Sequence, residues 1–102
     1  MEGMELICFE IISVAGNARS LFIEAIYEAR AGNIEKAKEL VEEGNKNFIE
    51  AHKVHAKLIQ SEASGNKTEV SLLLVHAEDQ LMSAEAFGVL VEEFIYIYQK
   101  IN

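Results

Sequence analysis

The sequence predicts an all-α fold, an antiparallel up-down-up bundle of three helices. Its 102 residues include no proline and six glycines, and Ala, Leu, Ile, Glu and Lys are abundant, as is typical of helical chains. Apolar residues recur at spacings of three and four through three long stretches, and glycine-containing breaks separate the stretches. We expect one domain over residues 1–102, with helices at about 5–31, 34–63 and 69–99.

The first stretch carries two adjacent apolar seams, which together are too broad to face a single neighbouring helix. We therefore expect the first helix to contact both of the others. Gly32 and Asn33 predict its end, because both tolerate the left-handed backbone of a helix C-terminus. One seam comprises Ile7, Ile11, Val14, Ala18, Leu21 and Ala25, and the other comprises Cys8, Ile12, Ala15, Arg19, Phe22, Ile26 and Ala29.

The second stretch has one apolar seam and a charged outer face, so we expect it to be a helix that packs back on the first. Asn66, followed three residues later by Glu69, predicts a capping box at the start of the third helix. The seam of the second helix comprises Ala37, Val41, Gly44, Phe48, Ala51, His55, Leu58 and Glu62.

The third stretch has two apolar seams, and each is interrupted by polar residues. We call them the His76 seam and the Asp79 seam. Because polar groups at core-facing positions are costly unless they are satisfied, the interruptions predict a polar pocket inside the bundle. Asp79 is also the only aspartate in the chain. The His76 seam comprises Leu73, His76, Gln80, Ser83, Phe87, Leu90, Phe94, Ile97 and Ile101, and the Asp79 seam comprises Leu72, Val75, Asp79, Met82, Ala86 and Val89.

All three stretches have more apolar surface than one small core absorbs, so we expect a homo-oligomer. The net charge of −8 disfavours nucleic-acid binding, which needs basic patches. No apolar run reaches the roughly 18 residues of a membrane span, and the first residues lack the basic region of a secretory signal, so we expect no direct membrane insertion. The single cysteine, Cys8, cannot form an internal disulfide. A cytoplasmic location fits these features.

Three interpretations of His76 remain open from the residues alone. A lone histidine on an apolar face is most often a satisfied core residue. His52 and His55 on the second helix can in principle join His76 in a zinc site, although no cysteine or further aspartate supports one. Alternatively, a neutral imidazole in a shallow apolar pocket is a good nucleophile near pH 7, which suits covalent phosphoryl carriage. The sequence has neither a glycine-rich phosphate loop nor a hydrolase-type Ser-His-Asp arrangement.

Residues 72–82 (LLLVHAEDQLM) resemble the active-site motif of the lactose/cellobiose-type enzyme IIA proteins of the bacterial sugar phosphotransferase system. The similarity extends to residues 15–20 (AGNARS), 51–52 (AH) and 58–65 (LIQSEASG), so it covers essentially the whole chain.

The resemblance implies a phosphotransferase that forms a homotrimer, a nine-helix bundle of three subunits. It implies that His76 accepts phosphate from the histidine-containing phosphocarrier protein. His76 would then pass the phosphate to a cysteine of the IIB component, in uptake of lactose-, cellobiose- or chitobiose-type sugars. It also implies that Asp79 lies near the threefold axis, where three copies share a divalent cation. Magnesium suits such a site, because it accepts a few carboxylate oxygens and keeps several waters.

The sequence departs from the family pattern at three places. Most members have a second histidine in place of Gln80, a glutamine in place of Glu78, and Gln-Thr in place of His55 and Ala56. Gln80 and Ser83 are the expected supporting residues of the pocket. Because Gln80 cannot carry charge, the alternative function is a non-catalytic helical adaptor or regulator that keeps the bundle without phosphoryl transfer.

Overall fold

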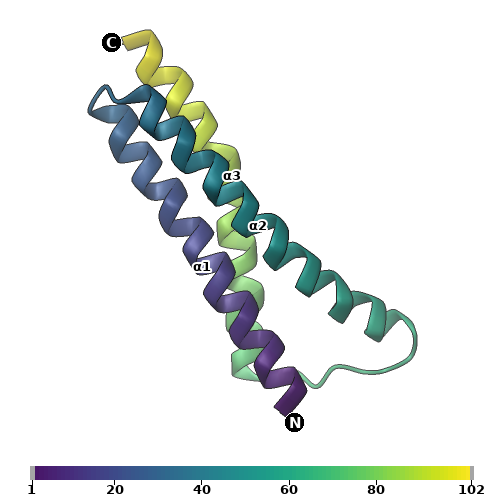
Figure 1. The fold of residues 1–102 in the computed structure, drawn as a ribbon. Coiled ribbons are helices and arrows are strands. Elements are labelled where there is room, and N and C mark those ends of the chain that lie inside the picture. Colours follow the sequence, from purple (N-terminus) through teal and green to yellow (C-terminus); the bar gives the residue numbers. More distant parts are fainter. Residues whose placement is uncertain (1, 102) are drawn as a thin grey trace.

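The computed structural model describes residues 2–101, which form three α-helices and no strand. They are α1 (Glu2–Arg30), α2 (Ile34–Ala63) and α3 (Leu72–Ile101). The bundle is a rod of 52 × 20 × 19 Å. Figure 1 shows that α1 and α3 run in the same direction and α2 runs against them, so the N-terminus and the start of α3 lie at the same end. The predicted all-α, up-down-up bundle is confirmed.

The first two helices end in the same way, at a glycine with positive φ. Gly32 has φ of 92° and Gly65 has φ of 101°, values that L side chains rarely adopt. At the end of α1, the Asn33 amide donates to Glu28 O at 2.8 Å. At the end of α2, the Asn66 amide donates to Ser61 O at 3.1 Å. This six-to-one hydrogen bond is that of a Schellman motif, which satisfies carbonyls that the helix leaves unpaired.

The third helix begins at Leu72, three residues later than the sequence predicts. The expected capping box of Asn66 and Glu69 is wrong, because residues 66–71 are not helical. Ser71 is the N-cap instead: its Oγ accepts a hydrogen bond from the Leu74 amide at 3.1 Å, and its carbonyl accepts one from the Val75 amide at 3.0 Å. Ser71 therefore sets where α3 starts.

The core lies along α1, which packs extensively against both other helices, whereas α2 and α3 contact each other much less. This confirms the expectation drawn from the two seams of α1. Most of the predicted seam of α2 is also buried, although Glu62 is exposed. The buried residues of α1 are Cys8, Ile11, Ala15, Ala18, Phe22, Ala25 and Ala29, and they come from both predicted seams.

The face of α3 that packs on the chain's own core differs from the predicted one. The His76 seam is half-buried at best, and His76, Leu90, Phe94 and Ile97 are exposed. Every residue of the Asp79 seam is exposed. The predicted polar pocket is therefore not inside the single chain. The buried seam is one position further round the helix and comprises Ala77, Leu81, Ala84, Val91 and Ile95.

Judged only by length and composition, residues Gly3–Arg30 of α1 could cross a membrane. The most apolar 18-residue window in this stretch has a mean hydropathy of 1.6. In the structure, 28% of that window is buried, and its buried side chains form the centre of the bundle. The core helix of a bundle and a membrane span share this composition, so one such helix is weak evidence for a span.

Candidate functional site

His76 lies in the second turn of α3, at the end of the rod that also contains the N-terminus (Figure 1). The Ser71 cap fixes the first turn of α3 and so fixes the position from which the imidazole projects. The imidazole is exposed, and so are Leu72 by 86% and Val75 by 51%, whereas Leu73 and Leu74 are half-buried against the core. His76 is therefore presented on an apolar surface that another protein can reach.

Asp79 lies one turn after His76 and is also exposed. It interrupts an apolar stripe on the Asp79 seam, where Met82 is 61% exposed and Val89 is 64% exposed. Residues 2–101 nowhere gather three His, Cys, Asp or Glu side chains that could hold a metal ion. One chain therefore offers a cation only a single carboxylate from Asp79, and further ligands have to come from other copies or from water.

Gln80 and Ser83 are both half-buried, and Gln80 lies against α1. A Cβ added to Gly16 would lie 3.6 Å from Gln80 Oε1, so the glutamine amide rests against the backbone of α1 at this glycine. The structure thus brings Gln80 to the helix interface and leaves His76 and Asp79 on the outer surface. All four predicted site residues lie on the first half of α3.

His55 and Glu78 form a side-chain contact between α2 and α3 that the sequence pattern does not predict. His55 Nε2 and Glu78 Oε2 are 2.7 Å apart, across the interface between α2 and α3. The side chain of His55 is 17% exposed and that of Glu78 is 44% exposed. Each residue had been noted separately as a departure from the family pattern, but their spacing in the sequence carries no signal of the contact, which depends on the register of two helices.

The contact also bears on the zinc interpretation. Because His55 Nε2 is engaged by Glu78, it is not directed at His76. His52 is exposed, and its ring lies 5.9 Å from the ring of Phe48, centroid to centroid, in a tilted arrangement. The three histidines therefore have different surroundings, and the residues described by the structure do not group them as ligands.

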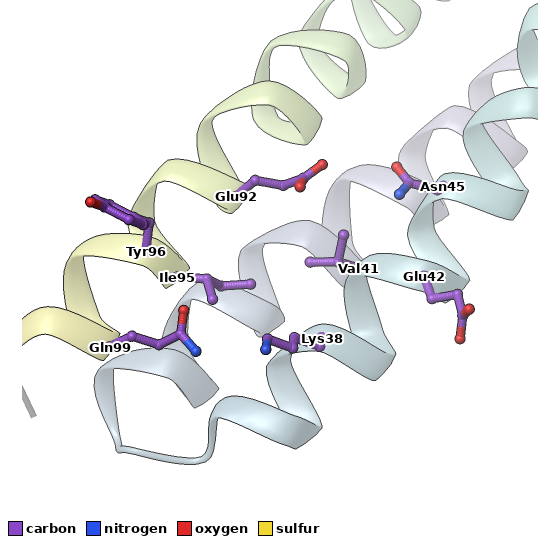
Figure 2. A pocket seen from close by; sticks show the side chains of 8 residues that line it. All are labelled: Lys38, Val41, Glu42, Asn45, Glu92, Ile95, Tyr96 and Gln99. Atoms are coloured by element: carbon purple, nitrogen blue, oxygen red, sulfur yellow. The ribbon is translucent and has the colours of Figure 1, made fainter.

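A groove between α2 and α3 lies far from these residues. It has a volume of about 520 Å³ and is open to solvent along the last turns of α3 (Figure 2). None of the predicted site residues lines it, so the groove is separate from the surface that carries His76. It follows from the sparse contact between α2 and α3. Its lining residues are Lys38, Val41, Glu42, Asn45, Glu92, Ile95, Tyr96 and Gln99.

Comparison with known proteins matches residues 6–99 to the family of the lactose/cellobiose-specific IIA subunit of the PTS system. The lichenan-specific phosphotransferase enzyme IIA component of Bacillus subtilis is 43% identical over 101 residues, which are 99% of this chain and 92% of that protein. The lactose-specific EIIA component of Staphylococcus aureus is 37% identical over 99 residues, covering 97% of this chain and 96% of that protein.

Solved structures agree with the sequence relatives. The cellobiose-specific enzyme IIA of Bacillus anthracis superposes with a TM-score of 0.92 at 44% identity, covering 94% of this chain and 88% of that one. The IIA(Chitobiose) of Escherichia coli, solved in complex with HPr, gives 0.81 at 35% identity, covering 95% and 94%. The match spans nearly the whole chain in sequence and in fold. The chain therefore belongs to the lactose/cellobiose-specific IIA family of the phosphotransferase system.

Proposed function

We propose that this IIA subunit carries a phosphoryl group on His76, which it receives from the histidine-containing phosphocarrier protein. The observation that supports this most directly is the exposed imidazole in the second turn of a capped helix, with the exposed apolar side chains of Leu72 and Val75 before it in the chain. A solved relative is a complex of a IIA protein with HPr, which supports the same donor for this chain.

The chemistry needs little from the protein beyond position. The lone pair of a neutral His76 ring nitrogen attacks the phosphorus of the donor's phosphohistidine. The new P–N bond forms as the donor's P–N bond breaks, and the electron pair returns to the donor imidazole. The exposed apolar residues around His76 become covered when the donor docks, which excludes water and slows hydrolysis of the phosphohistidine.

Gln80 and Ser83 would support this reaction from the next two turns of α3. Both follow His76 on the same seam and are half-buried, so their side chains have restricted freedom. The Gln80 amide and the Ser83 hydroxyl are neutral hydrogen-bond donors that can stabilise phosphoryl oxygens without adding charge. Neither replaces the nucleophile.

The second transfer would go to a cysteine of the IIB component in the cytoplasm. The thiolate attacks the phosphorus, and the bond to His76 breaks. Relatives are named for lichenan, lactose, cellobiose and chitobiose, which supports a sugar of this type for the pathway. The carrier itself only exchanges phosphate between two proteins, so its own residues do not select the sugar.

The assembly we propose is a homotrimer, a nine-helix bundle with the Asp79 seams of three copies around a common axis. Two features support it: the exposed apolar stripe that runs the length of α3, and the open side between α2 and α3. At such an axis three Asp79 carboxylates would repel one another unless a cation bridges them. Oxygen donors with room for water suit Mg²⁺, which would then be structural and take no part in transfer.

The test is phosphorylation with phosphoenolpyruvate, enzyme I and the histidine-containing phosphocarrier protein, followed by mapping of acid-labile phosphate. We expect label on wild-type protein and on His52→Ala, which removes another exposed histidine, and none on His76→Ala. Label that survives His76→Ala would overturn the assignment. A folded wild-type protein that takes no label would instead favour the non-catalytic adaptor, which the Gln80 departure allows.

A further inference from the structure

Glu78 brings a negative charge close to the residue that we propose as phosphoryl acceptor. It lies two residues after His76 on α3, so the two Cα atoms are about 5 Å apart in an α-helix and the side chains leave on different faces. A carboxylate on the order of 10 Å from a phosphoryl dianion opposes the arrival of that dianion at a partly desolvated surface. The position therefore calls for a group that restrains the carboxylate.

His55 is the group that does so. Its Nε2 lies 2.7 Å from Glu78 Oε2, and its side chain is only 17% exposed, so α2 holds the ring in place. Among the side chains that the structure describes, no lysine or arginine comes within ion-pair distance of Glu78. The carboxylate is thus directed at α2, and its hydrogen-bonding partner is an imidazole.

Cys8 shows that the charge of Glu78 also reaches the core. Burial raises the pKa of the Cys8 thiol, and the nearby Glu78 carboxylate raises it further. Cys8 belongs to α1, so one carboxylate acts at the junction of all three helices. The side of α3 that carries Glu78 is therefore the inner side, and the side that carries His76 is the outer one.

We propose that His55 is a positioning residue: its 2.7 Å hydrogen-bonding contact holds the Glu78 carboxylate against α2, so that His76 can accept a phosphoryl dianion. This inference rests on the proposed function.

The experiment compares His55→Gln, Glu78→Gln and the double variant for the rate of phosphoryl transfer from the phosphorylated carrier protein, with His52→Gln as a control. We expect His55→Gln to slow transfer about three- to tenfold, because it leaves an unrestrained carboxylate. Glu78→Gln and His52→Gln should transfer at the wild-type rate. The double variant, which has lost the hydrogen bond but also the carboxylate charge, should recover to within about twofold of wild type.

Salt separates an electrostatic role from a merely structural one. The defect of His55→Gln should shrink in about 1 M salt, where the screening length falls to about 3 Å. A defect that salt leaves unchanged, or a double variant as slow as His55→Gln, would overturn the proposal. A His55→Gln variant that transfers at the wild-type rate, while wild-type protein is labelled on His76, would also overturn the role of His55. That result would leave the proposed function intact. Absence of label on wild-type protein would overturn both.

Discussion

The ring of Phe22 fills the space that Gly44 leaves open. A Cβ added to Gly44 would lie 2.6 Å from Phe22 Cε1, closer than carbon atoms approach in proteins. Gly88 on α3 borders the same ring: a Cβ added there would lie 3.1 Å from Phe22 Cε2. Phe22 is almost fully buried. Glycines on α2 and α3 therefore allow one large side chain of α1 to fill the middle of the bundle.

We expect Gly44→Ala to destabilise the protein by about 1–3 kcal/mol, because the Phe22 ring has to shift within a packed core. Gly16→Ala is the matched control: its Cβ would meet only Gln80 Oε1, at 3.6 Å, and alanine is the better helix former. Urea unfolding followed by circular dichroism measures both. Equal stability of the two variants would contradict the packing argument.

Ser71→Ala should destabilise the protein by about 1 kcal/mol, because the Leu74 amide loses the Oγ that accepts its hydrogen bond. Asn66→Ala should have little effect, since α3 does not begin there. Thermal unfolding of the two variants decides between these starting points. A larger loss in Asn66→Ala would restore the capping box that the sequence predicts.

Asp79→Leu should keep or strengthen the proposed trimer and make it insensitive to removal of divalent cations. In the proposed trimer, the substitution would replace three mutually repelling carboxylates with apolar side chains on an apolar stripe. Sedimentation with and without EDTA provides the measurement. Dissociation of this variant into monomers would contradict the placement of Asp79 at the axis.

Met82→Lys should weaken the trimer by about tenfold or more in dissociation constant, because it puts a charge into the exposed stripe of α3. The control is Glu39→Lys, on the charged outer face of α2, which should assemble as wild type does. If both variants sediment like the wild type, the stripe is not the contact surface.

Stability should fall at alkaline pH because of Cys8. The pKa of its thiol is raised above 9.0 in the folded protein, so the thiol stays neutral in both folded and unfolded chains below that pH. As pH rises past 9.0, the unfolded chain loses the proton first and unfolding becomes more favourable. Free energies of unfolding at pH 7 and pH 10 should diverge more in wild type than in Cys8→Ala. An equal divergence would assign the effect to other groups.

The sequence predicted α1 well, because its two seams contain both large and small apolar residues at helical spacing. It predicted the inner face of α3 poorly. That face uses Ala77, Ala84 and Gly88, which carry little hydrophobic signal, whereas the exposed Leu90 and Phe94 carry a strong one. Periodicity alone does not tell a face that packs on its own chain from one available to another copy.

For the candidate site too, the sequence predicted features that lie within one helix and missed a contact between two helices. His76 and Asp79 were predicted as site residues because both interrupt apolar seams of one helix, and the structure places both on the exposed side of that helix. The contact of His55 with Glu78 was not predicted, since it joins residues 23 positions apart and depends on how α2 is placed beside α3. The start of α3 was missed because Asn66 and Ser71 are both good N-caps, and only the structure shows which one is used.

The parallel course of α1 and α3 has a practical consequence for handling the protein. His76 shares one end of the rod with the amino terminus, while the carboxyl end of α3 lies at the other, about 38 Å away at 1.5 Å per residue (Figure 1). A purification tag or fluorescent label attached after the last residue leaves the imidazole free for docking. The same attachment before the first residue would crowd the surface on which we propose that the phosphoryl donor docks.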